Sequence, residues 1–134
     1  MGRTQPTSEQ LEQFSALDHD GPIVMLNVLK FRQRANGEAG SGADAYGRYG
    51  EAVTRLVAEH GGRVLYAGPV LHTLIGEDVD DYDAVALVEY PSRQAFFDMI
   101  ASSAYGEAHE HRAAGLAHQL LIATDPAGLR ASGG

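Results

Sequence analysis

Three side chains in the C-terminal third of the chain have the types and the spacing of a small reaction centre. Tyr105, His109 and Arg112 stand at positions i, i+4 and i+7, so they share one face if residues 103–112 form a helix. An arginine fork holds a carboxylate or an enolate, a histidine moves a proton near neutral pH, and a tyrosine hydroxyl donates to an oxygen. The alternative is structural: Tyr105 packs in the core, Arg112 pairs with an acid, and His109 is solvated. The spacing predicts a catalytic role for the three residues and leaves the structural interpretation open.

Two further residues are ligand-binding candidates because of where they fall on expected elements. Asn27 interrupts a nearly continuous apolar segment, residues 22–31, on the same strand face as Met25 and Leu29. Its amide must find partners or face a cavity, because a buried unsatisfied amide is costly. Tyr49 lies near the start of a long amphipathic helix, beside a glycine-rich loop, where it either lines a pocket mouth or packs in the core.

A second candidate group lies in the middle of the chain. Tyr66 and His72 share the parity of a predicted β segment, and Glu89 lies on the next strand of the same hairpin. A His72/Glu89 pair would act as an oriented base, and all three residues are predicted ligand contacts. Gly68-Pro69 between Tyr66 and His72 favours a bulge, which can shift the register and separate the pair.

Metal and cofactor sites are not predicted. His109-Glu110-His111 places its histidines at i and i+2, which diverge on a helix, whereas helical metal pairs use i and i+3 or i+4. No histidine stands out as a haem ligand. Gly40 to Ala45 superficially matches a dinucleotide fingerprint but lacks the strand that should precede it directly. The chain has no cysteine, which excludes thiolate catalysis, and we expect no cofactor.

The elements that must position these residues follow from periodicity and from capping signals. Thr7 and Gln10 form a capping box before the first helix, and Gly61-Gly62 ends the long one. The sequence predicts a helix at 8–17, a strand at 22–31, a flexible loop at 32–43, a helix from 44 to 60, a β segment at 63–75, an acidic turn at 76–81, a strand at 82–90, a helix from 92 to about 101, a helical piece at 103–112, a strand at 116–124 and a mobile tail at 125–134.

After the leading helix this order is strand, helix, strand, strand, helix, strand, which is typical of an α+β ferredoxin-like βαββαβ fold. Its antiparallel sheet carries helices on one face only. The segment 22–31 is nevertheless apolar on both faces, so the open face needs a cover. We expect two copies to pair sheet to sheet as a homodimer, which is a closed two-fold assembly.

Bulk composition sets the remaining limits. The 134 residues suit a single domain, with a core at 22–124, and 44% hydrophobic against 21% charged residues is ordinary globular usage. Eighteen acidic against ten scattered basic residues give a net charge of −8, which argues against nucleic acid as a partner. The chain has neither a long apolar segment nor a secretory signal at its first residues, so we expect no membrane contact and a cytoplasmic location.

Several segments together resemble a known family. Asn27 to Arg32, Tyr46 and Tyr49, Gly61 to Gly68, Val88 to Ser92, Ser102 to Tyr105 and Arg112 carry the likeness. Over roughly residues 20–124 the chain resembles the domain of unknown function 1330 family. That resemblance implies a dimeric α+β barrel, whose superfamily includes cofactor-independent monooxygenases, isomerases, cyclases, haem-binding enzymes and non-catalytic members. The expected function is a small-molecule-binding homodimer that is either a cofactor-independent oxygenase, isomerase or cyclase or a non-catalytic binding or structural protein.

Overall fold

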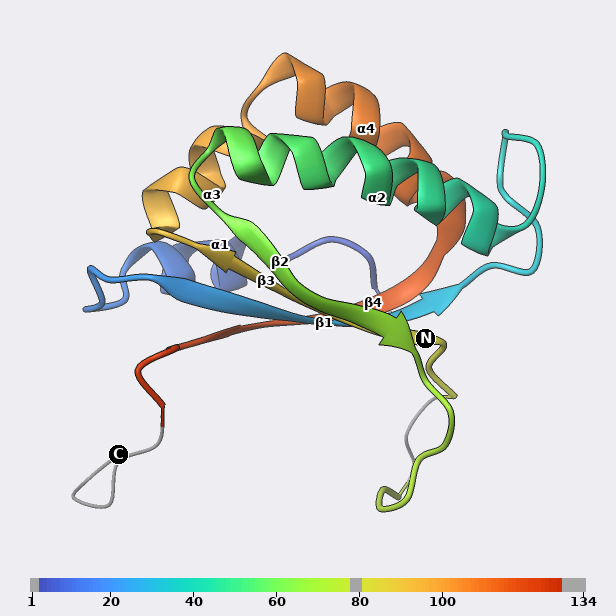
Figure 1. The fold of residues 1–134 in the computed structure, drawn as a ribbon, viewed down its shortest axis with the longest axis horizontal. Coiled ribbons are helices and arrows are strands. Elements are labelled where there is room, and N and C mark those ends of the chain that lie inside the picture. The colour runs from blue at the N-terminus through green and yellow to red at the C-terminus, as the bar shows by residue number, and fades with distance from the viewer. Residues whose placement is uncertain (1–2, 78–80, 129–134) are drawn as a thin grey trace.

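A computed structural model describes residues 3–77 and 81–128 of the chain. The elements are α1 (Ser8–Ser15), β1 (Ile23–Phe31), α2 (Gly42–Glu59), β2 (Arg63–Pro69), β3 (Ala84–Tyr90), α3 (Arg93–Ile100), α4 (Ser103–Gly115) and β4 (Leu116–Thr124). The four strands form one antiparallel sheet in the order β2-β3-β1-β4, and α2, α3 and α4 cover one face of it (Figure 1). This topology confirms the predicted ferredoxin-like fold.

Side-chain caps explain where the helices begin. Thr7 and Gln10 close a capping box at α1, and Ser41 and Asp44 close a second at α2. Ser102 accepts from the backbone of Tyr105 and so begins α4 immediately after α3. The first turn of α4 therefore fixes the position of Tyr105, and the helical period then places His109 and Arg112 on the same side.

The start of α2 and the end of α4 meet at two glycines. A Cβ added to Gly42 would lie 2.7 Å from the Gly115 carbonyl, and one added to Gly115 would lie 2.8 Å from the Tyr46 amide. Only glycine permits this approach of two backbones. Because α4 ends at Gly115 and β4 begins at the next residue, the close contact also fixes the α4–β4 corner.

The loop before α2 was predicted to be flexible, but it is tied to α4. The Arg32 amide donates to Gly115 O at 2.8 Å, and the Asn36 amide donates to Ala114 O at 2.9 Å. Glu38 accepts from Arg48 on α2 and from His111 on α4, both at 2.9 Å or less. Glu38 therefore links this loop to both helices.

The core lies between the helices and the inner face of the sheet. Its buried members share either the inward parity of β1 and β3 or the inner faces of α2 and α3, and they are Ile23, Met25, Leu56, Val57, Tyr90 and Met99. Leading helix α1 packs beside α3, where Phe14 contacts the rings of Phe96 and Phe97. Arg93 fixes it there by donating to four carbonyls at the C-terminal end of α1 and just beyond it.

The prediction of a β segment as far as Ile75 is wrong. Strand β2 ends at Pro69, which pairs with Ala84, and the chain leaves the sheet. Proline has no N–H for the ladder, and the apolar residues beyond it, which gave the β pattern, are fully exposed: Leu71, Leu74 and Ile75. The predicted acidic turn includes residues 78–80, and the predicted mobile tail includes 129–134; both stretches lie outside the described residues.

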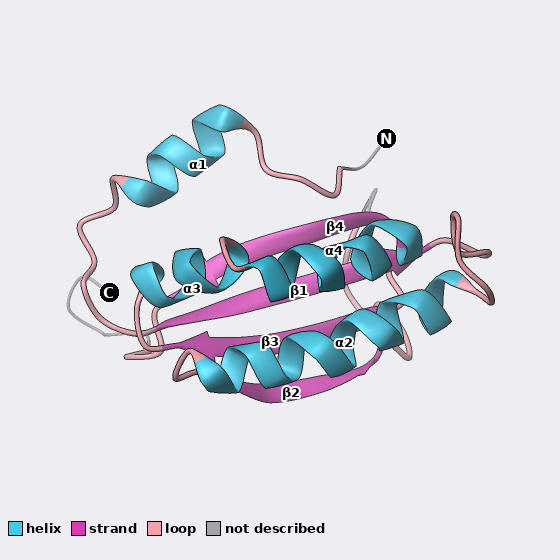
Figure 2. Cartoon of the chain, turned by 90° about the horizontal axis from the view of Figure 1, so that it is seen from above, coloured by secondary structure: helices cyan, strands magenta, loops and turns pink. Residues whose placement is uncertain are grey.

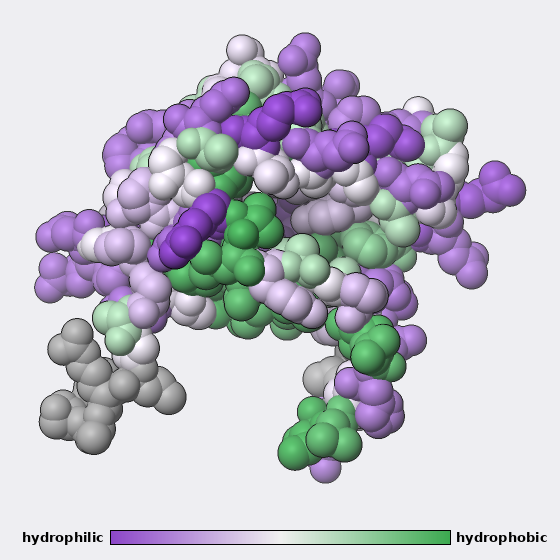
Figure 3. Space-filling view, viewed as in Figure 1, coloured by the Kyte–Doolittle hydropathy of each residue, from purple (hydrophilic) through white to green (hydrophobic). Residues whose placement is uncertain are grey.

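The face of the sheet opposite the helices is apolar. The register places Leu26 opposite Leu87 and Ile122, and Val28 opposite Val85 and Leu120, all with side chains of outward parity. Leu120 and Ile122 are each 46% exposed. Figure 3 shows the hydrophobic colour along this underside and on the segment that hangs below it. Among the described residues, no helix is long and apolar enough to cross a membrane.

Candidate functional site

The predicted group on α4 faces the space between α2, α4 and the sheet. The Tyr105 hydroxyl lies 3.0 Å from that of Tyr49 on α2, and the rings of Tyr105 and His109 are 5.9 Å apart. Arg112 reaches the sheet at Gln119, the fourth residue of β4. The helical spacing therefore brings the three predicted catalytic candidates into one cluster.

Arg112 is a buried cation with neutral partners. Its side chain is 9% exposed, and Nη2 donates to Gln119 Oε1 at 2.7 Å and to the Thr4 carbonyl at 2.5 Å. Within the described residues, no carboxylate oxygen lies within 4.0 Å of the guanidinium. The alternative in which Arg112 pairs with a structural acid therefore finds no such acid in this part of the chain.

Asn27 joins the same network through Gln119. Gln119 Nε2 donates to Asn27 Oδ1 at 2.8 Å, while Asn27 Nδ2 makes longer hydrogen bonds to the carbonyls of Met25 and Ala86. The amide of Gln119 is thereby oriented, with its oxygen on Arg112 and its nitrogen on Asn27. Asn27 thus has hydrogen-bond partners within the protein, and Gln119 links it to the buried guanidinium of Arg112.

A row of aromatic rings lines the cluster on the α2 side. The rings of Tyr46 and Tyr49 are 5.1 Å apart, and Tyr46 also stacks on Phe31. Burial raises the pKa of Tyr46 to about 12, and it raises the pKa of Tyr49 well above its ordinary value of 10, with the neighbouring tyrosine hydroxyls adding to the effect. These phenols are consequently neutral at physiological pH and can donate hydrogen bonds to an anion.

The surroundings of His109 disfavour its protonated form. Burial, and then the positive charge of Arg112, lower its pKa from the ordinary value of 6.5. Its Nε2 lies 3.0 Å from Gln5 Nε2. With the amide nitrogen as donor, Nε2 accepts, so the neutral ring carries its proton at Nδ1. A neutral imidazole beside a cation is suited to accept a proton.

The N-terminal segment closes this cluster from the β4 side. Residues 3–6 run beside β4 (Figure 2), where the backbone N–H of Gln119 donates to the Arg3 carbonyl at 3.0 Å. The next two residues contact the cluster: the Thr4 carbonyl accepts from Arg112, and the Gln5 side chain lies against His109. We call residues 3–6 the strap. Its polar contacts come from two backbone carbonyls, those of Arg3 and Thr4, and from the exposed glutamine Gln5, and none of these carries a recognisable motif.

The second predicted group is not brought to the cluster. Tyr66 pairs with Leu87 and lies on the outer face of the sheet, exposed. Glu89 also faces outward and binds Arg63 at 2.8 Å. His72 lies beyond the end of β2, past the Pro69–Ala84 pair, whereas Glu89 lies at the opposite end of the hairpin, opposite Arg63. The predicted His72/Glu89 pair therefore does not form.

Sequence reasoning missed Gln119, although its signal was present. Gln119 has the inward parity of β4, as Asn27 has the inward parity of β1, and each is a polar residue on the face of its strand that is turned toward the helices. The same parity argument applied to the last strand predicts Gln119 as a site residue. No group of three or more metal-ligating side chains occurs in the described part of the chain, and His111 is bound to Glu38.

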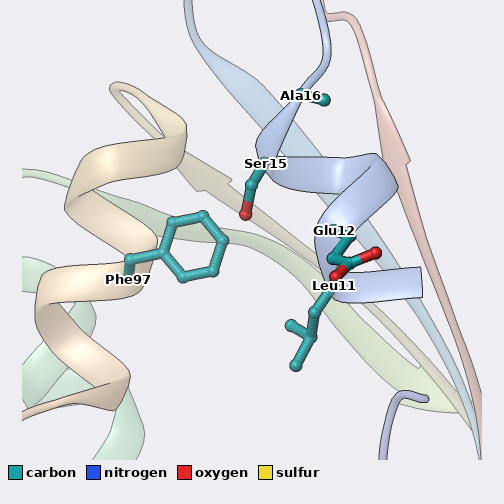
Figure 4. Close-up of a pocket in the computed structure, with 5 residues that line it drawn as sticks. All are labelled: Leu11, Glu12, Ser15, Ala16 and Phe97. Atoms are coloured by element: carbon teal, nitrogen blue, oxygen red, sulfur yellow. The ribbon is translucent and has the colours of Figure 1, made fainter. Parts of the chain in front are cut away.

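An apolar groove of about 520 Å³ lies elsewhere, between α1 and α3. Figure 4 shows Phe97 of α3 pointing toward α1, which contributes Leu11, Glu12 and Ser15. The groove is open, and its lining contains none of the predicted site residues. Size alone therefore does not identify the chemical site, and the convergence of Arg112, His109 and the phenols is the stronger guide.

Comparison with known proteins supports the fold and leaves the activity open. A protein of unknown function from Rhodopseudomonas palustris is 38% identical, with 94% of this chain and 98% of that chain covered and a TM-score of 0.86. A dimeric protein of unknown function with a ferredoxin-like fold from Bacteroides fragilis is 11% identical, with 78% and 96% covered and a TM-score of 0.52. A DABB family protein with a ferredoxin-like fold from Mesorhizobium loti is 15% identical, with 81% and 99% covered and a TM-score of 0.51.

No curated protein matches the sequence. The distant structures share the fold only. A family model matches residues 41–125, within the likeness that the sequence predicted over residues 20–124 and one residue beyond it. The matched range includes the whole of α2 and α4 and most of the cluster. The chain belongs to the family described as domain of unknown function DUF1330.

Proposed function

We propose that the protein binds a small organic anion, a carboxylate or an enolate, at Arg112 in the cluster between the sheet and helices α2 and α4. The observation that carries the proposal is a guanidinium 9% exposed with only neutral hydrogen-bond partners among the described residues. Arginine keeps its charge at any physiological pH, and a buried charge without a counter-ion is costly. An anionic ligand supplies the missing charge.

The neighbours of Arg112 suit a ligand that undergoes proton transfer. Neutral His109 accepts a proton from a carbon next to a carbonyl, and the resulting enolate oxygen is held by Arg112 and by phenol hydroxyls. Return of the same proton to the enolate oxygen gives the enol and completes a keto–enol isomerisation with no external oxidant or cofactor. The lowered pKa of His109 keeps the ring in the neutral form, which is the form that can take up the proton.

We further propose that two copies pair through the outer face of the sheet. Leu26, Val28, Val85 and Leu87 form the centre of that face, with Leu120 and Ile122 beside them. The segment that follows β2 hangs below the sheet on the same side (Figure 1) and contains Leu71, Leu74 and Ile75, which are 85–95% exposed. A self-complementary two-fold contact buries both sets. The ferredoxin-like protein from Bacteroides fragilis is described as dimeric, which supports this arrangement.

Calorimetric titration with benzoate at pH 7.5 tests the ligand proposal. Benzoate is expected to bind the folded protein and to raise its melting temperature, and Arg112→Gln is expected to abolish both effects. Arg55→Gln removes the same charge from an exposed position on α2 and should bind as the wild type does. If Arg112→Gln does not fold, Arg112→Lys keeps the charge without the fork and should bind more weakly. Absence of binding by benzoate and by a panel of aliphatic and aromatic carboxylates overturns the proposal.

Sedimentation velocity tests the dimer. Ile122→Lys places a charge on the outer face and should convert a dimer of wild-type protein into monomers. Leu17→Lys is the matched control, since Leu17 is 49% exposed against 46% for Ile122 but lies just after α1, away from that face. A wild-type chain that sediments as a monomer at micromolar concentration contradicts the dimer and leaves the ligand proposal standing.

A further inference from the structure

The strap makes polar contacts with the two groups that would act on a ligand. The Thr4 carbonyl accepts from Arg112 Nη2, and the Gln5 amide lies 3.0 Å from His109 Nε2. An acceptor on the arginine and a donor on the histidine are what a bound ligand has to offer at this site. The strap therefore satisfies the site with its own atoms in the absence of any ligand.

The strap is held far less firmly than the helix that follows it. Residues 3–6 have no helical or strand structure, and Arg3, Gln5 and Pro6 are exposed. Helix α1, by contrast, is fixed by its own capping box at Thr7, by the ring contacts of Phe14 and by Arg93. The chain can therefore pivot before Thr7 while α1 stays in place.

We propose that the strap occupies the ligand's place and that a ligand binds by displacing it. The ligand's carboxylate replaces the Thr4 carbonyl on Arg112, and a hydroxyl group of the ligand replaces the Gln5 amide as donor to His109. The ligand class is therefore a small hydroxycarboxylate. This inference rests on the proposed anion binding at Arg112 and adds the second group of the ligand and the route of access.

The exchange is favourable at the arginine. The Thr4 carbonyl makes one charge-assisted hydrogen bond to the guanidinium, whereas a carboxylate adds a second charge and can use both arms of the fork. The strap also prevents the cation from facing water when no ligand is present. Because the released segment is already exposed and irregular, its displacement disrupts no helix or strand.

A tryptophan reporter follows the strap directly. The chain contains no tryptophan, so Arg3→Trp gives a unique signal, and Arg3 uses only its backbone carbonyl in the contact with Gln119. Titration of the full-length variant with 3-hydroxybenzoate should change the tryptophan emission and its quenching by iodide, in step with binding measured by calorimetry. Benzoate should produce the same change with about fivefold weaker affinity, because it lacks one hydrogen bond.

Gln5→Ala tests the competition between strap and ligand. Removing the hydrogen bond to His109 weakens closure by about fivefold, so the apparent affinity for benzoate should rise by about the same factor. Gln13→Ala is the control, since Gln13 is an exposed glutamine of α1 whose side chain contacts Glu9 and not the cluster. It should leave the affinity unchanged.

The possible failures are distinguishable. Binding that depends on Arg112 but leaves the Arg3→Trp signal unchanged, with Gln5→Ala no tighter than wild type, refutes the displaced strap and retains anion binding. Equal affinities for benzoate and 3-hydroxybenzoate, with a moving strap, refute the hydroxyl contact with His109. Loss of all binding in the wild-type protein removes the proposed function and this inference together.

Discussion

The neutrality of Gln119 is the feature on which anion binding depends, and Gln119→Glu tests it with one isosteric change. The oxygen on Arg112 Nη2 stays where it is, 2.7 Å away, but becomes part of a carboxylate. Arg112 then has an internal counter-ion. We expect the variant to fold and to lose carboxylate binding.

The magnitude follows from Coulomb's law. Unit charges about 4 Å apart attract by about 4 kcal/mol at an effective dielectric of about 20, so the new carboxylate neutralises most of the field of Arg112. A ligand carboxylate on the same guanidinium would stand about 6 Å from the new one and be repelled by about 3 kcal/mol. That repulsion corresponds to about a 100-fold loss of affinity.

Stability should change much less. Desolvation of the new carboxylate offsets most of the attraction, as in other buried ion pairs. The variant also loses the donor that Gln119 Nε2 provides to Asn27 Oδ1, a hydrogen bond of about 1 kcal/mol. Attraction to Arg112 lowers the pKa of the introduced carboxyl in the folded state below the ordinary value of about 4.3. Any stability gained is therefore present above about pH 4.3 and is lost as the pH falls through the lowered pKa of the folded state.

Calorimetry with benzoate at pH 7.5 and urea unfolding at the same pH measure the two effects. Gln33→Glu makes the same change of charge in the exposed loop before α2 and should leave the affinity at the wild-type value. A folded Gln119→Glu protein that binds benzoate within about threefold of wild type, a free-energy difference of only about 0.65 kcal/mol, refutes the reasoning.

Three other expectations concern the groups around this arginine. Gly42→Ala pushes a Cβ into backbone carbonyl oxygens and should lower the free energy of unfolding by about 2 kcal/mol or more, whereas Gly47→Ala, which meets nothing within 4 Å, should not; urea midpoints decide. Tyr105→Phe removes the hydroxyl bonded to Tyr49 and should reduce stability by about 1 kcal/mol in the same assay. Because the folded state lowers the pKa of His109 from 6.5, the unfolded state takes up its proton first, and His109 contributes to a loss of stability as the pH falls below 6.5. Melting temperatures from pH 5 to 8 should show a shallower slope for His109→Gln. An unchanged slope contradicts the lowered pKa of this half-buried ring.

Much of the fold was predictable because its signals are local. Each helix start carries a capping side chain, and the alternation of apolar and polar segments indicates the order of helices and strands along the chain. The end of β2 was not predicted, because Leu71, Leu74 and Ile75 continue a β-like apolar pattern although the structure leaves them outside the sheet. Exposed apolar residues of a loop and apolar residues of a strand look alike in sequence.

Part of the candidate site was also predictable from the sequence, and part of it was not. The helical spacing of Tyr105, His109 and Arg112 predicted a shared face, and strand parity predicted that the amide of Asn27 finds partners or faces a cavity. The predicted pairing of His72 with Glu89 does not form, because the register of β2 with β3 ends at Pro69, before His72. Contacts of the strap were beyond sequence reasoning, since a backbone carbonyl such as that of Thr4 has no residue signature.

The architecture explains why the cation is buried at this corner. Because α4 leads into β4 without a loop, Arg112 and Gln119 meet across a turn that the Gly42–Gly115 contact holds in place. A sheet that served only to pair two copies would be more stable with apolar side chains at those two positions, since replacing buried charges by packed hydrophobic groups is often neutral or stabilising. We therefore propose that the buried guanidinium, which the Gln119 amide orients and the strap covers, serves a negatively charged ligand that takes the place of the strap.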